Sequence, residues 1–177
     1  MSKLKDIKQK FEKEGFVIIK NFFSKNEIRH FENALFTVYS KHLKTKVNKK
    51  NIHKIVSEKE MKGYFSLLYK CYNNYKNTMP FKKAAKKLSL FSKKIYEKRY
   101  EYLNSGMAIG IKNSKRTAYN WHQEHAYYKN IRNTLHYQFP IITPTSKKNG
   151  TMSVLSASHK LGHIKKVKNI KFSNESI

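Results

Sequence analysis

The stretch WHQEHAYY, residues 121–128, places a histidine and a carboxylate two positions apart, between aromatic side chains. On a β-strand, residues i and i+2 point to the same face, so His122 and Glu124 can both be directed at one point. An imidazole and a carboxylate are two of the three ligands in the facial triad that holds non-haem Fe(II) with open coordination positions. The stretch therefore predicts a strand that carries two metal ligands, His122 and Glu124, and the third ligand, another histidine, has to come from elsewhere.

Three other histidines in the second half of the chain, His125, His136 and His163, are candidates for that third ligand, and a structural role competes for each of them. His125 is an odd number of positions from His122, so on a strand it points to the other face. His136 falls on the next expected strand, where it either faces the same cavity or is an ordinary core or edge histidine.

Length and composition predict a single folded domain over residues 1–177. Apolar residues make up 39% of the chain, with 11 Phe and 12 Tyr, which is too many for a compositionally disordered protein. A single cysteine, Cys71, excludes an intramolecular disulfide and a multi-cysteine zinc site, and we expect it to be a small core residue. The sequence has no apolar run of membrane-spanning length and no signal-peptide core, so we expect a cytoplasmic protein.

The formal net charge of +27 is the second unusual feature, and four of the 38 basic residues are arginines. One explanation is binding to nucleic acid or to an anionic surface, because Lys and Arg contact phosphates in such complexes. The other is a coding bias toward Lys, Asn, Ile, Tyr and Phe, although such a bias leaves the few acidic residues unexplained. Because the lysines are spread over the whole chain, we favour the second explanation over a nucleic-acid partner. The Lys-rich segments, around residues 44–50, 82–94 and 165–171, are then solvated faces.

The first half of the chain has the apolar spacing of amphipathic helices. Ser24 and Glu27 form a capping-box signature, in which each side chain can bond the backbone of the other residue. A second signature begins at Ser57, after a Lys- and Asn-rich segment over residues 44–54 that we expect to be a loop. The expected helices cover about residues 3–14, 24–43, 57–72 and 80–97, with a short strand at 16–19.

The pattern changes after about Arg99, where short alternating segments are separated by Gly, Asn, Ser and Pro. The expected strands cover residues 107–111, 119–124, 134–142 and 151–155. A helical front of about residues 1–98 followed by a β-rich part of about residues 99–177 predicts an α+β fold, with the candidate metal ligands in the β-rich part.

Three segments in this order resemble the phytanoyl-CoA dioxygenase superfamily of Fe(II)/2-oxoglutarate-dependent oxygenases. The first, FEKEGFVIIKNFFS (residues 11–24), is similar to the family's opening strand and the turn into a helix. The second, WHQEHAYY, is similar to the family's Trp-His-Gln-Asp metal segment. The third, NGTMSVLSASHKLGH (residues 149–163), is similar to the family's Asn-Gly turn, strand and Gly-Ser-His-Lys loop. The three segments are spread from residue 11 to residue 163, so the resemblance covers essentially the whole chain.

The resemblance implies a double-stranded β-helix, the cupin-like jelly-roll of these oxygenases, with the N-terminal helices packed on it. It also implies Fe(II) and 2-oxoglutarate as cofactors and a small organic or lipid-like substrate. His122 and Glu124 would be metal ligands, and Gln138 and Phe139 would lie on a strand that lines the cosubstrate pocket. The Ser-His-Lys loop is structural in the family, so we interpret His159 and His163 as hydrogen-bonding residues of that loop. The substrate itself and the oligomeric state are not determined by these residues.

The sequence departs from the family pattern at two positions and at the C-terminus. Glu124 stands where the family usually has Asp, so its carboxylate is one methylene further from the backbone. Ala157 replaces a Gly, which is a mild change unless that position requires a positive φ. The family's second iron-binding histidine and its 2-oxoglutarate-binding arginine are expected beyond Ile177. The comparison therefore predicts a C-terminally truncated relative whose final strands are missing.

Three functions follow for testing. The first is a dioxygenase whose ligand set is completed by a further segment, a partner chain or His136. The second is a truncated relative without turnover. The third is a basic protein that binds nucleic acid or an anionic surface and reuses the fold.

Overall fold

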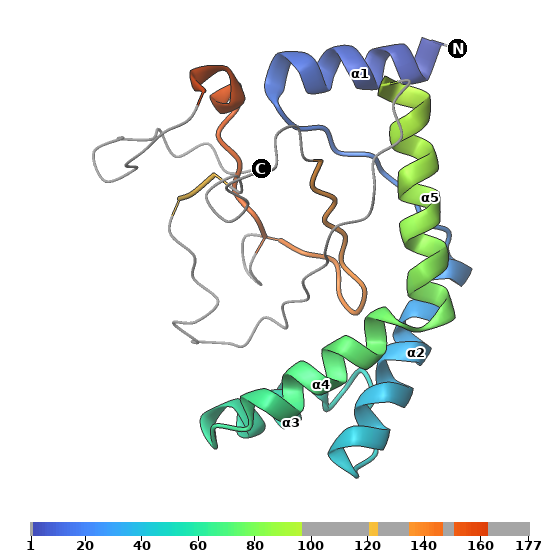
Figure 1. The fold of residues 1–177 in the computed structure, drawn as a ribbon, viewed down its shortest axis with the longest axis vertical. Coiled ribbons are helices and arrows are strands. Elements are labelled where there is room, and N and C mark those ends of the chain that lie inside the picture. Colours follow the sequence, from blue (N-terminus) through green and yellow to red (C-terminus); the bar gives the residue numbers. More distant parts are fainter. Residues whose placement is uncertain (1, 97–120, 124–134, 147–150, 163–177) are drawn as a thin grey trace. The chain divides into compact units, whose positions relative to one another are not determined.

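The computed structural model describes residues 2–96, 121–123, 135–146 and 151–162 (Figure 1). The chain divides into two compact units. Unit 1 comprises residues 1–19, 118–139 and 145–177, and unit 2 comprises residues 20–117 and 140–144.

Helices are the regular elements that the structure describes in both units. Unit 1 holds α1 and a short 3-10 helix, η3, and unit 2 holds α2, α3, α4 and α5 (Figure 1). Their bounds are α1 Ser2–Glu14, α2 Lys25–Leu43, α3 Ile52–Met61, α4 Phe65–Lys76, α5 Met79–Tyr96 and η3 Ser158–Leu161. The helices expected over residues 3–14, 24–43 and 80–97 are thereby confirmed.

The start of α2 is fixed by the capping box that the sequence predicts. The Glu27 backbone N–H donates to Ser24 Oγ at 3.2 Å, and the Ser24 N–H donates to Glu27 Oε2 at 2.8 Å. Lys87 of α5 adds to this cap, because its Nζ lies 2.9 Å from Glu27 Oε1 and 2.9 Å from the Phe22 carbonyl oxygen. The same ammonium lies 5.2 Å from the ring centroid of Phe22 and 5.0 Å from that of Phe23. One lysine thus joins α5 to the turn that begins α2.

The single helix expected over residues 57–72 is wrong, because two helices occupy this region. α3 begins at Ile52, so Ser57 lies inside a helix and caps nothing. α3 ends at Met61, and α4 begins at Phe65 after Gly63, whose φ is +75°. A left-handed backbone conformation cannot continue a right-handed helix, and glycine adopts it without a Cβ penalty.

The loop expected over residues 44–54 is correspondingly shorter, since it ends where α3 begins. Two asparagine side chains shape the turn. The Asn48 N–H donates to Asn51 Oδ1 at 2.8 Å, and the Lys50 N–H donates to Asn48 Oδ1 at 2.8 Å. Asn side chains that bond nearby backbone in this way favour turns, and here the turn leads directly into a helix.

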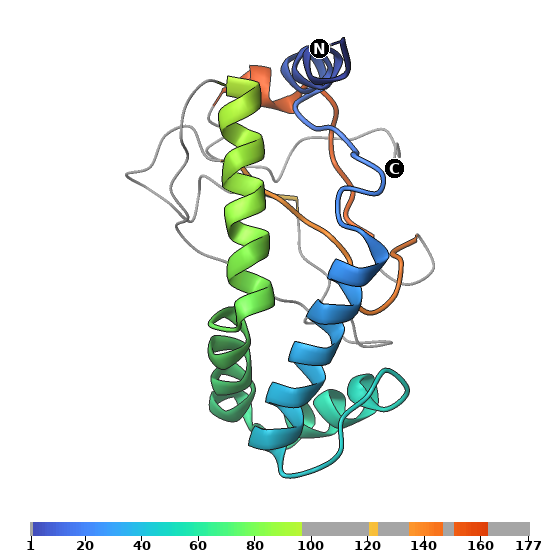
Figure 2. The same cartoon turned by 90° about the vertical axis from the view of Figure 1, so that its right-hand side faces the viewer.

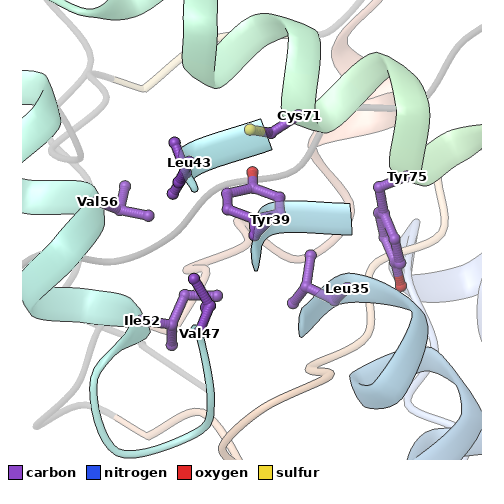
Figure 3. Packing of buried hydrophobic residues seen from close by; sticks show 8 residues of the cluster. All are labelled: Leu35, Tyr39, Leu43, Val47, Ile52, Val56, Cys71 and Tyr75. Atoms are coloured by element: carbon purple, nitrogen blue, oxygen red, sulfur yellow. The ribbon is translucent and has the colours of Figure 1, made fainter. Parts of the chain in front are cut away.

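The core of unit 2 lies where α2 packs against α4 and α5 and where α3 packs against α4 (Figure 2). Its buried side chains converge from α2, the following loop, α3 and α4, as Figure 3 shows: Leu35, Tyr39, Leu43, Val47, Ile52, Val56, Cys71 and Tyr75. Cys71 is fully buried, as expected, and burial raises the pKa of its thiol. Burial also raises the pKa values of Tyr39 and Tyr75 above the ordinary value for a phenol.

The predicted α+β fold with a jelly-roll is wrong for the residues that the structure describes, since these form helices and no strand. Residues 16–19, 121–123, 135–142 and 151–155 were expected in strands and have no regular secondary structure. Alternating apolar residues favour a half-buried extended segment, but a strand also requires a neighbouring segment with which its backbone forms a hydrogen-bonded ladder. The strand expected over residues 107–111 lies outside the described residues.

No helix within the described ranges is long and apolar enough to cross a membrane.

Candidate functional site

The candidate metal segment is described over Trp121–Gln123, in unit 1. His122 is exposed, and Trp121 keeps 41% of its surface exposed. Glu124, the second candidate ligand, lies outside the described residues, as do His125, Tyr127 and Tyr128. The common direction of His122 and Glu124 therefore stays a prediction from their spacing.

Gln123 ties this segment to the Ser-His-Lys loop. Its side-chain amide, Nε2, donates to the carbonyl oxygen of Gly162 at 2.9 Å, across 39 positions of sequence. Because the donor is the residue next to His122, this hydrogen bond holds the backbone that carries the candidate ligand. The sequence shows Gln123 as part of the motif but gives no sign of its partner.

The Ser-His-Lys loop contains a tight turn between two residues with positive φ. Ala157 has φ 59° and ψ 7°, and Gly162 has φ 68°. Between them, η3 is closed by the Lys160 N–H, which donates to the Ala157 carbonyl oxygen at 3.0 Å. Ala157 thus occupies a position with positive φ, where alanine is a less favourable residue than the Gly of the family.

The same loop is bonded to the end of α1. The Ala157 N–H donates to the Glu14 carbonyl oxygen at 2.7 Å, and the Ser156 hydroxyl donates to the Glu14 carboxylate. His159 Nε2 lies 3.0 Å from the Glu12 carbonyl oxygen, which can only accept, so this nitrogen carries the proton. The interpretation of His159 as a loop hydrogen-bonding residue is confirmed, and His163 lies outside the described residues.

Gly15 lies directly under this loop. Its φ is +81°, and a Cβ added to it would collide with the imidazole ring of His159. A side chain at this position would be strained by the backbone conformation and would require the His159 ring to move. Glycine at this position lets the chain leave α1 while the Ser-His-Lys loop lies against it.

The three sequence segments that carry the family resemblance thus meet within unit 1. The loop contacts the end of α1 through Glu12, Glu14 and Gly15, and it contacts the candidate metal segment through Gln123. Sequence reasoning identified the segments but missed the bonds of Glu14, Ser156 and Gln123. Long-range partners of this kind leave no periodic signal in a sequence.

The other predicted site residues lie on residues 135–139 of unit 1. Gln138 is exposed, Phe139 is half-buried and His136 is exposed. Nothing in the structure tests their predicted part in a cosubstrate pocket or a ligand set. Among the described residues, no three His, Cys, Asp or Glu side chains lie close enough together to hold a metal ion.

Comparison with known proteins gives one match. The profile of the family described as phytanoyl-CoA dioxygenase matches residues 11–176. No curated protein and no solved structure matches the chain.

Proposed function

We propose that this chain, which belongs to the phytanoyl-CoA dioxygenase family, is an Fe(II)/2-oxoglutarate-dependent dioxygenase. Membership of the family indicates a dioxygenase-type function. Its substrate would be a small organic or lipid-like molecule that is hydroxylated at a C–H bond. We propose that residues 1–177 serve this activity as one functional domain. The family is generally dependent on Fe(II) and 2-oxoglutarate, which supports both cofactors for this chain.

The proposed iron ligands are His122 and Glu124. A neutral imidazole and a carboxylate are the donor types that suit non-haem Fe(II), so the residues fit the metal in kind. The longer Glu side chain keeps the charge that the family's Asp supplies.

The observation that carries the proposal is the meeting of the three family segments in unit 1. Residues 12–15 and Gln123 both contact residues 156–162, as a family site that holds its metal segment in place would require, and these contacts support the proposal. The hydrogen bond from Gln123 to Gly162 holds the residue beside His122, and the loop that accepts it is itself fastened to Glu12 and Glu14. We therefore assign to Gln123 the role of orienting His122. Residues that orient metal ligands in this way contribute to the affinity for the metal.

When bound, the iron would supply the redox chemistry in which 2-oxoglutarate and oxygen give succinate and carbon dioxide while a substrate C–H becomes C–OH. The protein would contribute the placement of the substrate and the exclusion of water. Gln138 and Phe139 are the proposed lining of the cosubstrate pocket. An exposed amide can donate to a carboxylate of 2-oxoglutarate, and a half-buried ring can cover its methylene groups.

Turnover of 2-oxoglutarate tests this proposal. The full chain is incubated in air with Fe(II) and 2-oxoglutarate, and succinate is measured over time. We expect succinate formation that requires iron and falls at least 100-fold in His122→Ala, because a direct ligand should matter more than the outer groups whose loss costs about 10–100-fold. The control is His30→Ala, which removes an exposed histidine of α2 and should leave the rate unchanged.

Two results would contradict the proposal. Equal rates in the parent chain and in His122→Ala would remove His122 from the site. An absence of iron-dependent succinate formation in the parent chain would favour the alternative, a relative without turnover. Single variants of His125, His136 and His163 to Ala, assayed in the same way, would identify a third ligand.

A further inference from the structure

Lysines predominate on the exposed side of α5, where Met79 and Leu90 are also exposed. Five of its lysines are exposed: Lys82, Lys83, Lys86, Lys93 and Lys94. At 3.6 residues per turn they fall within an arc of about 120° around the helix axis and span about 18 Å along it. Met79–Tyr96 contains no acidic residue, so nothing within the helix offsets this charge.

The opposite face of α5 is already used inside unit 2. Ala84, Ser92 and Ile95 are buried, and the ring of Phe91 packs against Phe22 at a centroid distance of 5.0 Å. This face therefore cannot insert into a lipid surface unless its packing within unit 2 is disrupted. A helix that binds in the membrane interface needs a free apolar face, and Met79 and Leu90, which are exposed among the lysines of α5, do not form one, so the geometry argues against a membrane as the partner.

One further lysine of α5, Lys87, has its charge neutralised by an ion pair. Lys87, at the margin of the exposed arc, is held by Glu27 at 2.9 Å. None of the five lysines of the exposed face lies within salt-bridge distance of a carboxylate in the described part of the chain. The Lys-rich segment over residues 82–94 thus places five of its lysines together on one face of a helix.

We propose that this face of α5 binds the phosphate backbone of double-stranded nucleic acid without sequence preference. A row of positive charges about 18 Å long on a rigid helix complements a polyanion with regularly spaced phosphates. An α-helix also fits the major groove of DNA, which is about 12 Å wide. α5 has no arginine, the residue that most often reads guanine, so phosphate contacts dominate. This binding rests on residues separate from the proposed iron site.

The experiment compares two triple variants that remove the same charge from different places. The test variant is Lys82→Gln/Lys86→Gln/Lys93→Gln on the α5 face. The matched control is Lys25→Gln/Lys41→Gln/Lys70→Gln, three exposed lysines of α2 and α4 in the same unit. Affinity for a fluorescent 20-base-pair DNA duplex is measured by anisotropy over a range of salt concentrations, after circular dichroism has established that each variant is folded.

We expect the α5 variant to bind about 10- to 100-fold more weakly at 100 mM salt, with a log–log salt slope less steep by about two to three. The control should stay within about threefold of the parent, and Lys82→Arg/Lys86→Arg/Lys93→Arg should retain binding. An equal loss in the α5 variant and the control would show that net charge alone drives binding and would overturn the proposal. So would binding to phosphatidylserine vesicles without binding to DNA.

Discussion

Ala157 is an alanine in a backbone conformation that favours glycine. Its φ of 59° lies in the left-handed region, where a Cβ crowds the following carbonyl oxygen. Its N–H bonds Glu14 and its carbonyl oxygen closes η3, so the loop cannot relax by rotating this residue without losing both bonds. The sequence identifies the position through the family's Gly, but the sign of φ is visible only in the structure.

Ala157→Gly should therefore stabilise the protein, by about 0.5–1 kcal/mol in the free energy of unfolding, because relief of the left-handed conformation exceeds the entropy cost of glycine. Urea unfolding followed by circular dichroism measures the change. The control is Ala85→Gly in the interior of α5, which should destabilise by about 1 kcal/mol. A loss of stability in Ala157→Gly would mean that the Ala157 side chain contributes more by packing than its backbone conformation costs.

At the scale of elements, the start of α2 depends on a carboxylate that has two partners. The hydrogen bond from Lys87 is the largest cause that lowers the pKa of Glu27, followed by the bond from the Ser24 backbone. A carboxylate with a lowered pKa in the folded state stabilises the fold above its unfolded pKa. That contribution is lost as the pH falls through the folded-state pKa.

Glu27→Gln should accordingly lower stability at pH 7 and make little difference in acid. The expected loss at pH 7 is about 0.5–1 kcal/mol, since the ion pair is partly exposed and Gln can still accept from the Ser24 backbone. Urea unfolding of parent and variant at pH 7 and pH 3 measures this difference. A gap that stays the same at both pH values would contradict an ionic contribution from Glu27.

The ends of the elements show where the sequence is informative and where it fails. Ser24 and Glu27 are three positions apart and stand directly before a run with helical apolar spacing, so this start was predictable. Ser57 and Glu60 have the same spacing but lie within α3, because the turn made by Asn48 and Asn51 had already begun a helix. Two local signals for a helix start can lie close together, and the sequence alone does not show which of them begins the helix.

At the scale of the whole molecule, the helical half was predictable because its apolar residues repeat at helical spacing and its core is built from neighbouring helices. The second half was not. The strands expected at residues 135–142 and 151–155 require partners from distant segments, and the described residues there have no regular structure. The sequence identified the three segments and the hydrogen-bonding role of His159 in its loop, and the roles of His122 and Glu124 stay predictions. The bonds that bring the segments together, from Gln123 and His159, depend on long-range geometry.

Binding of Fe(II) to the full chain tests the central claim most directly, because it requires no knowledge of the substrate. Equilibrium dialysis without oxygen, in the presence of 2-oxoglutarate, measures the dissociation constant for the parent, His122→Ala, Glu124→Ala and the control His30→Ala. We predict about one iron per chain, with affinity at least 10–100-fold weaker in both ligand variants and unchanged in the control. The same affinity for iron in the parent and in His122→Ala would contradict the account.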